Sequence, residues 1–154
     1  MSKKNKLQRF AENKTFDNLF EYSYERIMSE GFPLQGKWGS DFFHNDNPIV
    51  LELGCGKGEY TVGLARAHAD INYIGVDIKG ARIWRGLKQS NEEHLPNVAF
   101  VRARIDQIEH FFGPDEVSEI WVTFPDPHPG EGVRNARHRL TSPEFLQRYR
   151  KIVK

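Results

Sequence analysis

The sequence lacks several features on which whole classes of function depend. It contains one cysteine, Cys55, among 154 residues, which excludes an intramolecular disulfide framework and a cysteine-based zinc cluster. No apolar run approaches the roughly 20 residues that a helix needs to cross a bilayer. The basic residues at the start are followed by no apolar stretch of the kind found in secretory signals. We therefore expect a cytoplasmic protein without a membrane segment.

Motifs for three common kinds of chemistry are missing as well. The six histidines show no spacing typical of paired metal ligands, so no metal site is expected. Neither the G-x-S-x-G elbow of serine hydrolases nor the Walker A phosphate loop is present. Cys55 stands between two glycines, where a small filler side chain is a more ordinary role than a nucleophile. The sequence therefore gives no support to a metal, serine-hydrolase or phosphate-loop site.

Charge is distributed unevenly along the chain, although the net charge is only +1. Residues 1–14 carry five basic residues against one acidic residue, and residues 130–154 carry seven against two. Residues 15–129 carry ten basic and eighteen acidic residues. Cationic clusters are the usual electrostatic footprint of a protein that binds a polyanion. Solvated surface charge is the alternative interpretation of the same pattern.

From Pro48 onward, short apolar runs alternate with longer segments of helical character. The pattern predicts strands over residues 49–53, 72–77, 97–101 and 119–124. Helices are predicted over residues 59–69, 80–94 and 106–112 and from Ser142 onward, after a long loop over residues 125–142. Such alternation is typical of βαβ units, which build a parallel sheet. The expected fold class is therefore α/β, with a doubly wound parallel sheet.

The first 45 residues follow a different pattern. They are rich in aromatic residues and broken by glycine and proline, and only a short helix over residues 18–29 is expected. We interpret residues 1–45 as an N-terminal extension and residues 46–154 as the main domain. Because no further strand follows the last predicted helix, we expect this domain to be partial and its sheet to be incomplete at the C-terminus.

Two motifs follow the first two predicted strands, at the edge of a parallel sheet where ligands bind. Glu52 precedes Gly54-Cys55-Gly56-Lys57-Gly58, a turn whose glycines let a ligand approach the backbone closely. Its G-x-G-x-G spacing differs from the G-x-G-x-x-G of dinucleotide sites. Asp77 ends the second strand, where a carboxylate can accept hydrogen bonds from both hydroxyls of a ribose. A helix-capping role is the alternative for Asp77.

Two further motifs follow the third and fourth predicted strands. In Arg104-Ile105-Asp106, the position of Asp106 favours a helix cap over a ligand group. Three prolines in Thr123–Pro129 stiffen the last motif. They would hold Asp126 still at the end of the fourth strand, as a functional carboxylate requires. An ordinary proline-rich turn is the alternative.

Taken together, these segments resemble the tRNA (guanine-N7)-methyltransferase family. The resemblance covers Leu51–Gly58, Tyr73–Lys79, Phe124–Pro127 and Arg137–Thr141. The first segment is shared by many enzymes that use S-adenosylmethionine (SAM), whereas F-P-D-P followed by a basic stretch and R-L-T is more specific. The resemblance implies a class I SAM-dependent methyltransferase fold (Rossmann-like), SAM as the cofactor, and a guanine in the variable loop of tRNA as the methyl acceptor.

The resemblance also implies which residues contact the cofactor. Glu52 and Gly54 would line the methionine end of SAM, with Gly56 as a further contact. Asp77 would bind the ribose. Arg104 occupies the position of the adenine contact, where family members usually carry Asn or Asp.

Catalysis and substrate binding are assigned in the same way. Asp126 would lie at the reacting edge of the pocket, as the catalytic residue and as a further cofactor contact. The tRNA would be held by a basic cluster that consists of Arg134, Arg137 and Arg139. A second basic group could contact tRNA phosphates without reading sequence: Lys3, Lys4, Lys6 and Arg9.

Other interpretations stay open. A SAM-dependent methyltransferase that acts on a small molecule would share Glu52, the glycines and Asp77, but would not need the basic cluster. A chain that binds SAM without catalysis is a second alternative. An NAD-dependent oxidoreductase is disfavoured by the glycine spacing. The sequence does not distinguish a monomer from a homodimer.

Overall fold

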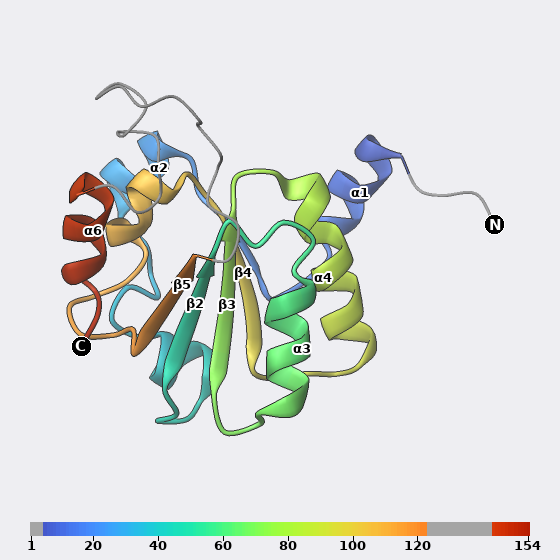
Figure 1. Cartoon of the computed structure of the whole chain (residues 1–154). Helices are drawn as coiled ribbons and strands as arrows, with labels where there is room; N and C mark the ends of the chain where they lie inside the picture. The colour runs from blue at the N-terminus through green and yellow to red at the C-terminus, as the bar shows by residue number, and fades with distance from the viewer. Residues whose placement is uncertain (1–4, 123–142) are drawn as a thin grey trace.

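The computed structural model describes residues 5–122 and 143–154 and shows a five-stranded sheet with helices on both faces (Figure 1). The elements are α1 (Lys6–Asn13), β1 (Leu19–Glu21), α2 (Tyr24–Glu30), the π-helix η1 (Trp38–Phe43), β2 (Ile49–Leu53), α3 (Glu59–Ala67), β3 (Asn72–Asp77), α4 (Gly80–Glu92), β4 (Val98–Arg102), the 3-10 helix η2 (Ile105–His110), β5 (Glu119–Val122) and α6 (Pro143–Arg150). The strand order is β1-β4-β3-β2-β5, and every pairing is parallel. The predicted α/β class with a doubly wound parallel sheet is confirmed.

The elements after Pro48 agree closely with the prediction. Strands β2 and β3 have the predicted bounds, and β4 is shifted by one residue. Every residue of β2 and β3 is buried, as expected for central strands covered on both faces. Helices α3 and α4 each end two residues before the predicted position. The predicted loop over residues 125–142 and the last two residues of the predicted fourth strand lie outside the described residues.

The region before Pro48 departs from the prediction. The helix expected over residues 18–29 is wrong in its first part, because residues 19–21 form β1 and pair with β4. The Asn18 side-chain amide fixes this pairing, since it donates to the carbonyl of Val98 and to the hydroxyl of Ser90, each at 3.2 Å. A three-residue strand is too short to show a period of its own. Residues 5–45 thus contribute an edge strand and three helical segments to the fold.

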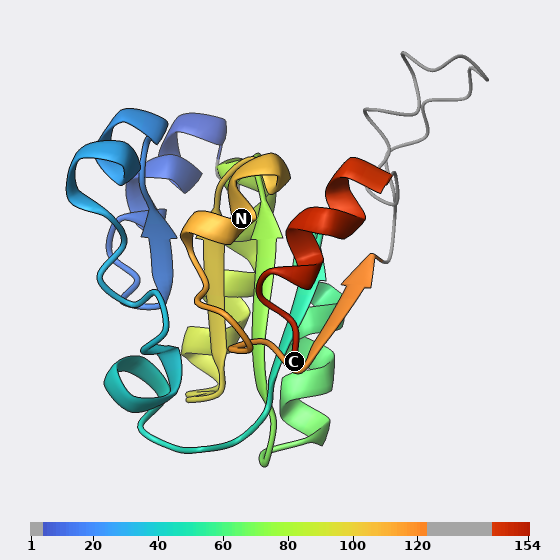
Figure 2. The ribbon, with the colours of Figure 1, turned by 90° about the vertical axis from the view of Figure 1, so that its left-hand side faces the viewer.

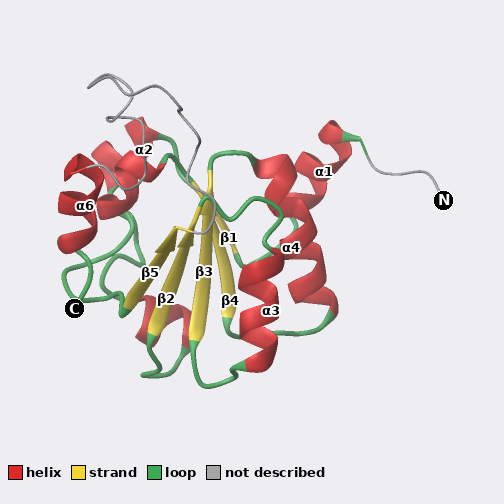
Figure 3. Ribbon diagram, viewed as in Figure 1, coloured by secondary structure: helices red, strands yellow, loops and turns green. Residues whose placement is uncertain are grey.

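The apolar core lies in two layers on opposite faces of the sheet. On one face, α2, η1, η2 and α6 enclose a cluster around the fully buried Trp38, whose ring stacks on Phe112 at 5.5 Å between centroids. On the other face, Val62 of α3 and Leu87 of α4 belong to a second cluster with Phe100 of β4. Figures 2 and 3 show the strands between these two helical layers. Among residues 5–122 and 143–154, no helix has the length and apolar character of a membrane-spanning segment.

Candidate functional site

The carboxyl ends of the central strands bring the predicted site residues to one edge of the sheet. Leu53 at the end of β2 lies opposite Val76 of β3, and Asp77 at the end of β3 lies opposite Arg102 of β4. The turn after β2, the end of β3 and the loop after β4 are therefore neighbours. In an open parallel sheet this edge is where ligands bind.

The glycine turn has a backbone that favours glycine at alternate positions. Gly54, Gly56 and Gly58 have φ values of 69°, 57° and 75°, in the left-handed region where a Cβ atom is unfavourable. A Cβ atom on Gly58 would lie 2.8 Å from the Phe100 ring, whereas one on Gly56 would meet nothing within 4 Å. Gly58 is therefore required for packing, and Gly56 faces open space that a ligand could occupy.

Asp77 connects β3 to this turn. Its Oδ2 atom accepts the backbone N–H of Gly56 at 2.9 Å, and its Oδ1 atom accepts the backbone N–H of Lys79 at 2.9 Å. Helix α4 begins at Gly80, and the residue at its N-cap position is Lys79, which makes no side-chain capping bond. Asp77 thus supports the loop before α4 without capping the helix. Each carboxylate oxygen has a second lone pair, so the group can still accept hydrogen bonds from a ligand.

Glu52 lies on the same edge and accepts a hydrogen bond from helix α3. The side chain is 7% exposed, and its Oε1 atom accepts a 2.9 Å hydrogen bond from the Thr61 hydroxyl of α3. Thr61 is itself buried, and a buried carboxylate needs such donors. Thr61 could not be predicted from the sequence, because no local pattern shows which side chain of α3 faces β2.

The Cys55 thiol is buried in the glycine turn and is influenced by both carboxylates. Burial raises the pKa of the Cys55 thiol, and the charges of Asp77 and Glu52 raise it further. Both carboxylates therefore act on the same thiol from the two adjacent strands. A buried thiol with a raised pKa is a poor nucleophile, which supports the interpretation of Cys55 as a filler.

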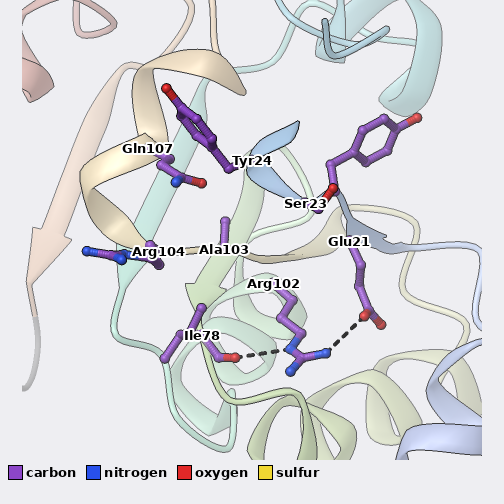
Figure 4. A pocket seen from close by; sticks show the side chains of 9 residues that line it. Glu21, Ser23, Tyr24, Ile78, Arg102, Ala103, Arg104 and Gln107 are labelled. Atoms are coloured by element: carbon purple, nitrogen blue, oxygen red, sulfur yellow. Dashed lines mark hydrogen bonds and ion pairs between the residues drawn. The ribbon is translucent and has the colours of Figure 1, made fainter. Parts of the chain in front are cut away.

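A hollow of about 500 Å³ lies at the β4 end of the edge, and Ile78, the residue after Asp77, is part of its lining (Figure 4). This volume falls in the range of small-molecule sites. Ile78 follows Asp77 directly and is 49% exposed, so it can present an apolar surface to a ligand. The residues that line the hollow come from the ends of β1, β3 and β4 and from α2 and η2: Glu21, Tyr22, Ser23, Tyr24, Ile78, Arg102, Ala103, Arg104 and Gln107.

Two ion pairs border the hollow. Arg102 donates to the carbonyl of Ile78 at 3.0 Å and to the Glu21 carboxylate at 3.2 Å, as the dashed lines in Figure 4 show. Arg104 donates to Asp106 at 2.8 Å. The prediction that Asp106 caps a helix is wrong, because η2 begins after Arg104 and makes no side-chain capping bond. Asp106 instead forms an ion pair with Arg104, the residue predicted to contact the adenine.

The remaining predicted site residues are only partly within the described chain. Asp126, Arg134, Arg137 and Arg139 lie outside the described residues, as do Lys3 and Lys4. Lys6 is exposed at the start of α1, and the Arg9 guanidinium lies 4.9 Å from the centre of the Trp84 ring on α4. Within residues 5–122 and 143–154, no group of three histidine, cysteine or acidic side chains could hold a metal ion.

Solved structures show the same fold. A SAM-dependent methyltransferase from Aquifex aeolicus is 16% identical, with a TM-score of 0.54 over 99% of this chain and 69% of that chain. The antibiotic-resistance methyltransferase Kmr is 20% identical, with a TM-score of 0.53 over 86% of this chain and 61% of that chain. At these identities the similarity establishes the class I SAM methyltransferase-like fold.

Sequence comparisons show the family. The family model described as "Putative methyltransferase" matches residues 46–154. A tRNA (guanine-N(7)-)-methyltransferase from Christiangramia forsetii is 56% identical over all 154 residues, which span 68% of that protein. A protein of the same name from Bacteroides fragilis is 52% identical over 97% of this chain, which spans 58% of its length. The chain therefore belongs to the tRNA (guanine-N(7)-)-methyltransferase family.

Proposed function

We propose that the chain binds SAM and transfers its methyl group to N7 of a guanine in the variable loop of tRNA. The observation that carries this proposal is the 56% identity, over the whole chain, to a relative named for the reaction. The edge formed by Glu52, the glycine turn and Asp77 supports the cofactor part of the proposal, because it combines open space with buried carboxylate acceptors.

The order of the groups along the edge supports one orientation of SAM. Asp77 lies on β3, between the glycine turn that follows β2 and the hollow that follows β4. The methionine end would lie at the turn, near Glu52, Gly54 and Gly56, and the ribose hydroxyls would bind Asp77. The adenine would then extend past Ile78 into the hollow, on the side of Arg104.

The proposed methyl transfer requires that the two reactants be positioned, and it requires no proton transfer to activate the acceptor. SAM supplies an electrophilic methyl group. Guanine N7 carries a lone pair and no proton, so no general base is required. The residues of the chain would hold the two reactants in line, an effect that can contribute about 7–11 kcal/mol. We assign to Asp126 the orientation of the guanine edge or of the SAM ammonium, and support of the positive charge that develops on the base.

Basic residues support tRNA as the partner. Arg134, Arg137 and Arg139 near one end of the sequence and Lys6 on α1 would contact phosphates and position the RNA without reading its bases. Phosphate contacts release counterions, so tRNA binding should weaken steeply as salt rises. A salt-independent affinity would contradict this part of the proposal.

Methyl transfer from radiolabelled SAM tests the function directly. The chain is offered two tRNA transcripts, one with guanosine and one with 7-deazaguanosine, which lacks the accepting nitrogen. The proposal expects label only on the guanosine transcript. Label on both transcripts would contradict N7 as the acceptor. If the chain binds SAM but labels neither transcript, the proposed transfer is wrong, and binding without catalysis is the better interpretation.

A further inference from the structure

The outer wall of the hollow comes from a part of the chain that the family model does not match. The model matches residues 46–154, whereas residues 21–24, at the corner between β1 and α2, line the hollow opposite η2. Because β1 pairs with β4 in register, this corner is fixed beside the end of β4. The N-terminal segment therefore completes a site whose other residues belong to the matched domain.

The position of Tyr24 is well defined. Ser23 caps α2, since its hydroxyl accepts the backbone N–H of Arg26 at 3.2 Å, and Tyr24 is the first residue of that helix. The Tyr24 side chain is 51% exposed. In Figure 4 it extends from the start of α2 on the side of Gln107, away from Arg102.

Most other groups around the hollow already have partners. Arg102 is held by Glu21, and Arg104 by Asp106. The neighbouring ring of Tyr22 has the Arg26 guanidinium 3.9 Å from its centre and packs on Phe32 at 5.2 Å. By contrast, the described residues place no ring or cation against Tyr24. A half-exposed aromatic face beside a hollow of small-molecule size is the group best suited to receive a planar base.

We infer that Tyr24 stacks on the adenine of the cofactor and determines how tightly that end is held. The inference rests on the proposed function, because it assumes that SAM lies along the edge with its ribose on Asp77. Stacking of a base on an aromatic side chain is a general source of affinity, and its loss on substitution by alanine weakens binding by roughly 5- to 150-fold. Tyr24 is thus a cofactor-binding residue contributed by the N-terminal segment.

The test uses S-adenosylhomocysteine as a stable probe and measures its dissociation constant by calorimetry. Tyr24→Ala should weaken binding about tenfold, whereas Tyr24→Phe, which keeps the ring, should bind like the wild type. Tyr60→Ala is the matched control, since Tyr60 is 52% exposed on α3 and does not line the hollow. The melting temperature without ligand should be similar in all four proteins.

Adenosine supplies a second readout, because it has the base and ribose but no methionine end. Tyr24→Ala should weaken adenosine and S-adenosylhomocysteine by the same factor, because the lost contact is with the base that both ligands carry. A general loss of structure would instead lower the melting temperature of the variant. If the wild type binds the probe and Tyr24→Ala binds it equally well, the inference is wrong and the proposed function stands. If the wild type does not bind the probe, the proposed cofactor site itself is wrong.

Discussion

The sheet edge at which the carboxyl ends of the strands meet has two halves, and they are built differently. The β2–β3 half is closed: Asp77 holds the turn at Gly56, and Thr61 holds the buried Glu52. The β4–β1 half is open, with a hollow of about 500 Å³ between partly exposed side chains. The closed half is formed within βαβ units. The open half is formed by segments far apart in the sequence, as the pairing of β1 with β4 and the contact of Arg102 with Glu21, 81 positions apart, show.

This difference suggests that the two halves of the edge bind different parts of the proposed cofactor. Buried, hydrogen-bonded carboxylates are fixed in position and are costly to disturb, which suits the ribose and the methionine end of the proposed cofactor. Exposed ion pairs contribute little energy individually, so the open half can accommodate a flat base without rebuilding a core. Variants that remove the fixed contacts of the closed half should therefore have larger effects than variants that remove the ion pairs of the open half.

The largest effect is expected from Asp77→Ala. This variant removes the proposed acceptor for two ribose hydroxyls as well as the partner of two backbone N–H groups. Hydrogen bonds to a charged group contribute about 1.5–3 kcal/mol each, so S-adenosylhomocysteine should bind at least about 100-fold more weakly. Calorimetry measures the change. Asp70→Ala removes an exposed carboxylate and should leave the affinity unchanged; equal losses in both variants would contradict the role of Asp77.

Gly58→Ala tests the packing of the closed half. The new Cβ atom would meet the Phe100 ring at 2.8 Å on a backbone with φ of 75°, so the free energy of unfolding should fall by about 2–3 kcal/mol. Urea unfolding measures it. Gly63→Ala, in α3 with nothing within 4 Å, should be neutral or stabilise by up to about 1 kcal/mol. A stable Gly58→Ala variant would show that the turn tolerates a side chain.

A smaller effect is expected from Thr61→Val, which keeps the shape of the side chain and removes the hydroxyl that donates to Glu52. Loss of a donor to a buried group costs about 1–3 kcal/mol. We expect S-adenosylhomocysteine to bind about fivefold more weakly, because the Glu52 carboxylate is no longer held from α3. Thr61→Ser restores a hydroxyl and should recover the affinity. If Val and Ser variants bind alike, the hydrogen bond does not position Glu52.

The smallest effect belongs to the open half. Arg102→Gln removes the ion pair with Glu21, in which the two side chains are 35% and 33% exposed. Partly exposed pairs of this kind contribute at most about 1 kcal/mol, so urea unfolding should show a loss below that of Gly58→Ala. Arg26→Gln, which breaks a more exposed pair with Glu30, is the reference. A loss from Arg102→Gln larger than that of Gly58→Ala would reverse the comparison between the two halves.

The sequence predicted the closed half well and the open half poorly. The positions of Glu52, the glycine turn and Asp77 at this edge could be predicted because a strand, a glycine-rich turn and a helix follow one another directly in the chain, and their binding roles stay predictions. Residues 19–21 were predicted as helix, since only pairing with β4 makes them a strand. The roles inferred for Tyr24 and Thr61 could not be predicted from a pattern, because they depend on which distant element each side chain faces. The role of Asp126 stays a prediction, as that residue lies outside the described part of the chain.

A crystal structure of the chain with S-adenosylhomocysteine would test the central claim most directly. We expect both ribose hydroxyls within hydrogen-bond distance of the Asp77 carboxylate, the homocysteine end at the Gly54–Gly58 turn, and the adenine in the hollow beside Ile78 and Tyr24. A ligand bound away from this edge, or one whose base points toward β5 with Asp77 unengaged, would contradict it.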